Sequence, residues 1–199
     1  MRKPSEVVLK GKTLQEHINA HEKWLKDKDG GIRLVLHFTY LSNIYLSGAN
    51  LKYSNLSHAD LSDTDLSDTD LSGANLSGAH LCCANLSGAN LSGADLRGTD
   101  LRGTDLRFTI LSCADLSGAN LSGADLRGAN IDFSQLNLSY KGLNFKIDER
   151  QAKQLMYHII NLMQYSNLDV NKVVKKHMYK WLKDSHIVKE HNIPILKKP

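Results

Sequence analysis

The chain of 199 residues has no apolar run long enough to span a membrane, and its first residues lack the apolar core of a signal peptide. It has only three cysteines. Cys82 and Cys83 are adjacent and poorly placed to pair with each other, and Cys113 lies far along the chain. Free thiols are typical of a reducing compartment, so the sequence predicts a cytoplasmic protein without structural disulfides.

The chain also lacks a catalytic constellation. Its Asp and Ser residues recur at regular positions, whereas a general acid or base needs a cleft and a shifted pKa. His17 and His21 are four residues apart, a spacing that binds metals on a helix, but no third ligand accompanies them. We interpret them as structural histidines, and the sequence predicts no enzyme activity, no metal and no cofactor.

What the chain has in abundance is a five-residue repeat. From Leu41 to Leu136 every fifth residue is Leu, with Ile131 as the only substitute, which makes twenty repeats without an insertion. With that residue as position i, position i−2 is nearly always Ala, Thr or Ser, and position i−1 is mostly Asn or Asp. Position i+1 is mostly Ser or Arg, and position i+2 is mostly Gly. A fixed period of this kind indicates a repeat architecture.

A period of five matches neither an α-helix nor a β-strand, so Leu at this spacing forms no continuous face on either. The period suits a coil in which each repeat is one straight side followed by a corner. Positions i−2 and i then point inward, positions i−1, i+1 and i+2 point outward, and Gly at i+2 accommodates the backbone turn. Large Leu and small Ala alternate inside, which fills the interior without strain.

The tandem motif Ala-(Asp/Asn)-Leu-x-x resembles the pentapeptide-repeat proteins. The resemblance implies an all-β solenoid, a right-handed quadrilateral β-helix with four repeats per coil and about five coils. At the spacing between strands, five coils make a rod on the order of 24 Å long. Residues 34–38 are predicted to add one irregular repeat, so the β-helix is expected over residues 34–138.

Helical segments are expected on both sides of the solenoid. In residues 1–33, Thr13 and Glu16 form a capping box, followed by an apolar face that includes Leu14 and Ile18, which predicts a helix that caps the first coil. Tyr40, Tyr45 and Tyr53 are expected to pack beneath this cap. Residues 139–199 predict two amphipathic helices. Antibiotic-resistance members of the family dimerise at this end, so we expect a homodimer interface at Val170, Val174, Met178, Trp181 and Leu182.

Charge is divided unevenly along the chain. Residues 34–138 hold five Lys or Arg and eleven Asp, whereas residues 139–199 hold twelve Lys or Arg and five Asp or Glu. The second coil contains five acids with no Lys or Arg between them, namely Asp60, Asp63, Asp65, Asp68 and Asp70. Duplex DNA carries one charge per about 1.7 Å, so a rod of this length needs roughly fourteen charges to match it. The sequence therefore predicts partial DNA mimicry, with solubilisation of the rod as the alternative role of these acids.

Two further surfaces are candidates for partner binding. Phe108 and Ile110 replace the usual Gly and Asp or Asn at outward positions, and with Phe133 they predict an exposed apolar patch. The basic C-terminal segment is predicted to place five lysines on one helical face: Lys172, Lys175, Lys176, Lys180 and Lys183. This face is either an ordinary solvated surface or a binding site for nucleic acid or an acidic partner.

Taken together, these features predict a non-enzymatic protein-interaction module. The concrete hypothesis is inhibition or protection of a nucleic-acid enzyme, such as a topoisomerase or a nuclease, by partial DNA mimicry. The alternatives are a scaffold or assembly protein without a DNA-related role, and direct nucleic-acid binding through the basic C-terminal helices.

Overall fold

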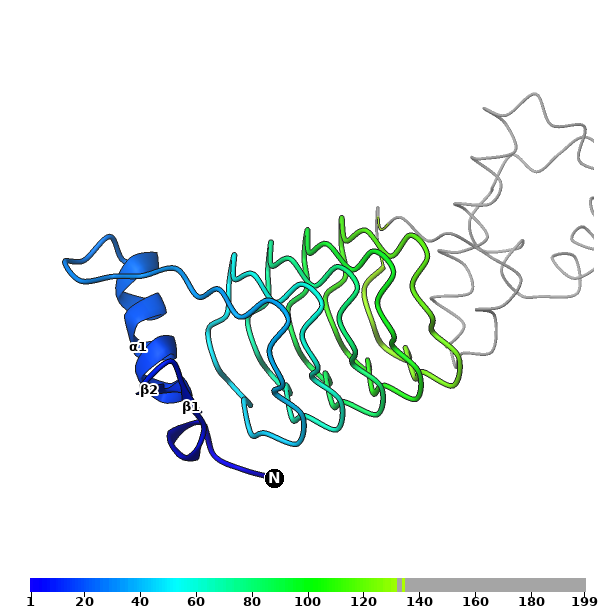
Figure 1. Ribbon diagram of the computed structural model, residues 1–199. Helices are drawn as coiled ribbons and strands as arrows, with labels where there is room; N and C mark the ends of the chain where they lie inside the picture. The colour runs from blue at the N-terminus through cyan, green and yellow to red at the C-terminus, as the bar shows by residue number, and fades with distance from the viewer. Residues whose placement is uncertain (132–133, 135–199) are drawn as a thin grey trace, which may run out of the picture. The chain divides into compact units, whose positions relative to one another are not determined.

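The computed structural model describes residues 1–131 and 134 (Figure 1). From residue 34 onward the described chain winds into stacked coils. Isolated parallel bridges join each residue at position i−1 to the residue twenty positions later, as in Tyr40↔Asp60 and Asp60↔His80. Twenty residues, or four repeats, therefore make one turn. The bridge Val35↔Asn55 continues the same pattern one coil before Asn55, so the coils begin at the predicted irregular repeat of residues 34–38.

Adjacent coils are joined by backbone hydrogen bonds in a constant pattern. The N–H of position i donates to the C=O of position i−1 in the next coil, as from Leu61 to His80 (2.7 Å). The N–H of position i−1 donates to the preceding coil, as from Asp60 to Thr39 (3.0 Å). Because each side contributes to both neighbours, the backbone polar groups of an internal coil are paired with the coils on either side.

Corners fall where the repeat predicts them. Gly at position i+2 has a positive φ, for example +69° at Gly48, and the N–H of Ala49 donates to the C=O of Leu46 (3.0 Å) across the corner. Residues other than Gly adopt the same conformation at this position, including Asp63 (φ +55°) and Phe108 (φ +59°). The conformation is thus dictated by the coil, and Gly is the residue that adopts it without steric cost.

The interior is filled by the residues at positions i and i−2. The central leucines from Leu41 to Leu126 are buried, as is Ile131. Ile44, which stands at position i−2 where the other repeats have Ala, Thr or Ser, is buried as well. Where Thr replaces Ala inside, its hydroxyl donates to a backbone carbonyl, as from Thr69 to Leu66 (2.7 Å). The buried Oγ of Ser54 has no such partner within the described residues. The predicted inward and outward positions are therefore confirmed.

The N-terminal segment folds against the first coil (Figure 1). It consists of the 3-10 helix η1 (Pro4–Glu6), the antiparallel strands β1 (Val8–Leu9) and β2 (Lys12–Thr13), and the helix α1 (Leu14–Leu25). Thr13 and Glu16 form the predicted capping box at the start of α1. Leu14, Ile18 and His21 are the buried residues of the helix, and the side chain of His21 hydrogen-bonds to the backbone of the first coil.

The prediction that three tyrosines pack beneath this segment is wrong. Tyr40 is 81% exposed, and Tyr45 and Tyr53 are about half exposed. Their positions, i−1 and i+2, point away from the coil, whereas α1 contacts the end of the coil. The ring of Tyr53 instead lies against Gly73, at the equivalent corner of the next coil.

Candidate interaction surfaces

The outward side chains form four columns, because each coil repeats the preceding one after twenty residues. At position i−1 the bridges define the Tyr40 column, the Tyr45 column, the Asn50 column and the Val35 column. The Tyr40 column continues through Asp60, His80, Asp100 and Asn120, and the other three are built in the same way. A surface that runs along the solenoid axis therefore consists of residues from one column. A surface that runs around the solenoid consists of residues that are close together in the sequence.

The five acids of the second coil run around the solenoid and do not stack into a column. Asp60, Asp65 and Asp70 lie in three different columns, and Asp63 and Asp68 occupy the two corners between them. We call these five residues the acidic belt. Asp63 and Asp68 are exposed, whereas Asp60, Asp65 and Asp70 are half-buried. The belt covers three sides of one coil, so its charge is concentrated at one level of the solenoid.

The three half-buried acids also have a structural role. The Oδ1 of Asp60 accepts hydrogen bonds from the backbone N–H (3.1 Å) and the hydroxyl (2.6 Å) of Ser62. Asp65 and Asp70 bind Ser67 and Ser72 in the same way. Asn makes identical contacts elsewhere, as between Asn75 and Ser77. The hydrogen bonds therefore require an oxygen at this position, and the negative charge of the Asp residues is additional to that requirement.

Acids further along the chain are neutralised by arginines. Arg102 reaches back to Asp100 (2.6 Å), and the same two-residue spacing joins Arg97 to Asp95, Arg107 to Asp105 and Arg127 to Asp125. The hydrogen bonds from Arg97, Arg102 and Arg107 lower the pKa values of their partners Asp95, Asp100 and Asp105. Among the described residues no Lys or Arg forms a salt bridge with the acidic belt. The belt is thus the principal uncompensated negative charge of the described solenoid.

Phe108 and Ile110 are both on the surface, with exposed fractions of 69% and 41%. The ring of Phe108 lies against the backbone of Gly128 at the same corner of the next coil. A positive φ is a genuine outlier for a bulky side chain, so this aromatic residue occupies a corner that favours Gly. Phe133, the third residue of the predicted patch, lies outside the described residues.

The two N-terminal histidines bind backbone carbonyls. The Nε2 of His17 is 3.0 Å from the carbonyl oxygen of Leu9, and the Nε2 of His21 is 2.9 Å from that of Lys52. Within residues 1–131 and 134 no group of three or more His, Cys, Asp or Glu is arranged to hold a metal ion. Cys82, Cys83 and Cys113 are free thiols, and burial is the main cause that raises the pKa of Cys82.

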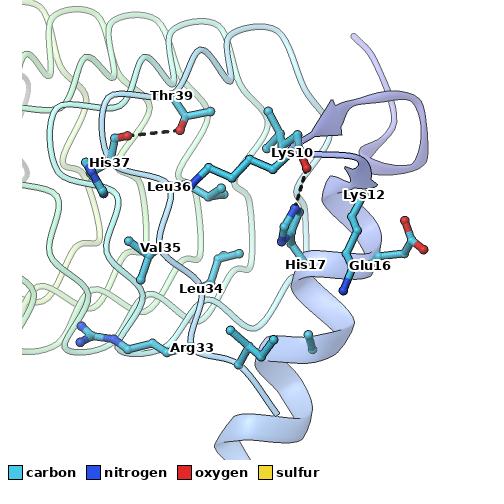
Figure 2. Close-up of a pocket in the computed structure, with 13 residues that line it drawn as sticks. Lys10, Lys12, Glu16, His17, Arg33, Leu34, Val35, Leu36, His37 and Thr39 are labelled. Atoms are coloured by element: carbon cyan, nitrogen blue, oxygen red, sulfur yellow. Dashed lines mark hydrogen bonds between the residues drawn. The ribbon is translucent and has the colours of Figure 1, made fainter. Parts of the chain in front are cut away.

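A groove that the sequence did not predict lies between the N-terminal segment and the first coil (Figure 2). Its apolar lining comes from both parts of the chain and includes Leu9, Ile32 and Val35. The cations Lys10, Lys12 and Arg33 also line it, and Glu16 is its only acid within residues 1–131 and 134. Sequence patterns did not reveal it because it forms between segments whose relative placement no periodicity encodes.

Two predicted sites fall outside the part of the chain that the structure describes. They are the dimer interface, Val170, Val174, Met178, Trp181 and Leu182, and the basic face, Lys172, Lys175, Lys176, Lys180 and Lys183. Both stay predictions. Among the described residues, no helix is long and apolar enough to cross a membrane.

Four-sided coils with an interior filled by Leu define a pentapeptide β-helix. The model of the family "Pentapeptide repeats" matches residues 33–68, 69–107, 99–132 and 109–139, which is more than half of the chain. The chain belongs to the pentapeptide repeat family. No curated protein sequence matches it. Pentapeptide repeat proteins are generally structural or interaction modules and not enzymes.

Several solved structures are similar. Rfr23, a pentapeptide repeat protein of the cyanobacterium Cyanothece, is 25% identical over 69% of this chain and 97% of its own, with a TM-score of 0.47. HetL from Nostoc sp., involved in heterocyst differentiation regulation, is 35% identical over 53% of this chain and 56% of its own, with a TM-score of 0.22. QnrB1, a plasmid-mediated fluoroquinolone resistance protein, is 19% identical over 64% of this chain and 95% of its own, with a TM-score of 0.28. Because all three TM-scores are below 0.5, nothing about the partner of this chain follows from them.

Proposed function

We propose that the chain is a non-enzymatic interaction module whose acidic belt binds a basic surface of a protein partner. The observation that carries the proposal is the contrast between two sets of acids. Asp95, Asp100, Asp105 and Asp125 each have an arginine two residues away, whereas the acidic belt has no such cation. Uncompensated charge gathered on a rigid coil attracts a surface of the opposite sign and steers its approach.

The partner class that fits this surface best is a nucleic-acid enzyme, such as a topoisomerase or a nuclease. Such an enzyme has a basic surface that normally receives phosphates. The belt gathers five carboxylates within one coil, a thickness of about 4.8 Å, whereas duplex DNA spreads its charges along its axis at about one per 1.7 Å. The belt thus imitates a short cluster of phosphates at one level of the solenoid, which is a local form of DNA mimicry.

A second candidate function is assembly through the apolar residues Phe108 and Ile110. The specific observation is that Phe108 and Ile110 are 69% and 41% exposed at outward positions that are otherwise mostly polar. An exposed apolar patch on a polar surface is typical of a contact site. In this alternative the chain acts as a scaffold, and its partner binding depends on the apolar patch and not on the belt.

The test compares two variants with equal charge. In the belt variant Asp60, Asp63, Asp65, Asp68 and Asp70 are all changed to Asn. The control variant has the same change at the five other acids of the described solenoid, Asp95, Asp100, Asp105, Asp115 and Asp125. Asn already supports the corner at position i−1 and tolerates a positive φ at position i+2, so both variants are expected to fold.

Each protein is titrated into DNA supercoiling by a bacterial type II topoisomerase and into duplex cleavage by a nuclease. We expect the wild type and the control variant to alter at least one activity and the belt variant to lose the effect. Fluorescence anisotropy with a labelled duplex distinguishes enzyme binding from DNA binding. If the wild type and the belt variant have equal effects, the proposal that the acidic belt binds the partner is wrong. If a Phe108→Gly, Ile110→Asn variant loses the effect, the result favours the alternative in which the apolar residues bind the partner.

A further inference from the structure

The first coil has an open backbone edge at Val35. The C=O of Leu34 accepts from the N–H of Asn55 (2.9 Å), and the N–H of Leu36 donates to the C=O of Asn55 (2.8 Å). In a parallel ladder the residue between such a pair directs its own N–H and C=O to the opposite side. Those two groups of Val35 have no hydrogen-bond partner among residues 1–131 and 134. The Val35 edge is therefore a template for another strand.

Other parts of the same coil edge are covered. Arg2 pairs in parallel with Ile44: its N–H donates to the C=O of Asn43 (2.9 Å), and its C=O accepts from the N–H of Tyr45 (2.8 Å). The carbonyl of Lys52 is bonded by His21, and that of Tyr53 accepts from the Nε of Arg33 (2.6 Å). An extended segment thus already pairs with the Tyr45 side, which shows that this edge accepts an added strand.

The groove beside Val35 matches an extended peptide in shape and composition (Figure 2). Its apolar lining includes Ile32 and Val35, which are 61% and 45% exposed. Figure 2 shows the side chain of Lys10 extended across the groove toward Leu36. A strand that pairs with Val35 through its backbone would rest alternate side chains on this lining and project the others outward.

Charge identifies the peptide as acidic. Lys10, Lys12 and Arg33 line the groove, and Glu16 is the only acid that the described part of the chain contributes to the lining. The carboxylate of Glu16 is committed to the N–H (2.7 Å) and the hydroxyl (2.9 Å) of Thr13, which hold it in the capping box. Among the residues that the structure describes, the lining contains no Phe, Tyr or Trp on which nucleic-acid bases would stack. Backbone pairing, aliphatic lining and net positive charge together select an acidic polypeptide.

We propose that this groove binds an extended acidic segment of a partner protein, which adds as a strand to the Val35 edge. The aliphatic side chains of the segment pack on Ile32 and Val35, and its carboxylates face Lys10 and Lys12. The site is separate from the acidic belt, which attracts the opposite charge, so each proposal can fail without the other. The chain then has two binding surfaces of opposite sign.

The test uses the full-length protein and a fluorescein-labelled heptapeptide of alternating Val and Glu, with anisotropy as the readout. One comparison peptide replaces Glu by Lys. A second carries N-methyl groups on all its backbone amides, which removes the amide donors of both strand edges and keeps the charge. We expect saturable binding of the acidic peptide that weakens with salt. We expect about tenfold weaker binding of the N-methylated peptide, the size of effect that loss of about 1.4 kcal/mol of backbone pairing causes.

Variants of the protein test the same contacts by changing residues of the groove. Val35→Pro removes an N–H that makes no hydrogen bond in the described fold, and Pro is tolerated on edge strands. Lys10→Gln with Lys12→Gln removes two cations of the groove, and Lys26→Gln with Lys28→Gln is a matched control outside it. Both groove variants should weaken peptide binding about tenfold, as for the peptide comparison, and the matched control and the belt variant should bind normally.

Several results would overturn the proposal. They are absence of binding at millimolar peptide, equal binding of the Lys peptide, and equal binding of the N-methylated peptide. If Val35→Pro fails to fold, the N-methylated peptide still decides whether strand pairing occurs. If the wild type self-associates and the acidic peptide does not compete, the occupant of the edge is a second copy of the chain, and the acidic-segment proposal is wrong.

Discussion

The imidazole of His21 accepts a hydrogen bond from the backbone N–H of Leu34 at its Nδ1 atom, over 3.1 Å. Its Nε2 lies 2.9 Å from the carbonyl oxygen of Lys52 and must therefore carry the proton of a neutral ring. His21 is fully buried, and its ring stacks on Trp24. One side chain thus joins α1 to both ends of the first coil, and it does so only in the neutral form.

Stability of the fold is expected to fall in mild acid because of His21. Burial is the main cause that lowers the pKa of this residue below its ordinary value of about 6.5. A histidine with a lowered folded-state pKa contributes stability that is fully present above the unfolded-state pKa. That stability is lost as the pH falls below about 6.5 toward the folded-state pKa. Chemical denaturation between pH 7.5 and pH 5 measures the loss, with α1 followed by the fluorescence of Trp24 in a Trp181→Phe background.

A His21→Gln variant is the control for this prediction. Gln cannot titrate, so the variant should be less stable at pH 7.5 and should lose the part of the pH dependence that His21 contributes. His17→Gln, on the same helix, should leave that dependence intact. A pH profile that is identical in wild type and His21→Gln would contradict the assignment.

Replacement of Asp60 by Asn is expected to leave stability within about 0.5 kcal/mol, because Asn accepts the same hydrogen bonds from the following Ser in other coils. Asp60→Ala removes the oxygen that binds the N–H and hydroxyl of Ser62, and should cost about 1 kcal/mol. Urea denaturation of the two variants gives the comparison. A cost for Asp60→Asn as large as that for Asp60→Ala would mean that the charge, and not the oxygen, supports the corner.

The coils were predictable from the sequence because each rule of the repeat is local. Leu every fifth residue, a small residue two positions earlier and Gly two positions later together specify a side, an interior and a corner. The two-residue spacing from Asp100 to Arg102 is likewise local, and it recurs in the other three ion pairs of the same kind. These inferences need no knowledge of which distant residues meet, since every coil repeats the preceding one.

Features that depend on a break in the repeat were harder to predict. The exposure of Tyr40 and the open edge at Val35 depend on how far the N-terminal segment extends over the first coil. That extent is set by contacts such as Arg2 with Asn43 and His21 with Lys52, which join residues with no shared pattern.

Truncation of one interior leucine should destabilise the solenoid strongly. Leu91 is completely buried, and Leu91→Ala removes packing from a core that has no room to collapse, so we expect a loss of about 2–5 kcal/mol. Ser112→Ala, at an outward position, should change stability by less than about 0.5 kcal/mol. Thermal unfolding by circular dichroism measures both. Equal effects would contradict the placement of Leu91 inside the coil.

The contact between Phe108 and Gly128 predicts that the loss of stability caused by Gly128→Ala depends on the side chain at position 108. Gly128→Ala forces a Cβ against the ring of Phe108, in addition to the strain of a positive φ (+78°). Gly118→Ala suffers similar strain (φ +72°), but its Cβ would make ordinary contacts near 3.8 Å. We expect about 1 kcal/mol for Gly118→Ala and about 1–3 kcal/mol more for Gly128→Ala, from overpacking.

A Phe108→Gly background separates the two causes. It removes the ring and the left-handed strain of Phe108 itself, so the single variant should be as stable as the wild type or more so. In this background Gly128→Ala should cost no more than Gly118→Ala, which gives a coupling energy of about 1–3 kcal/mol in a double-mutant cycle. Additive effects would mean that the ring turns away from Gly128 without cost. A coupled result instead shows that Phe108 is held over the next coil as a fixed part of the surface, which a rigid apolar contact with a partner requires.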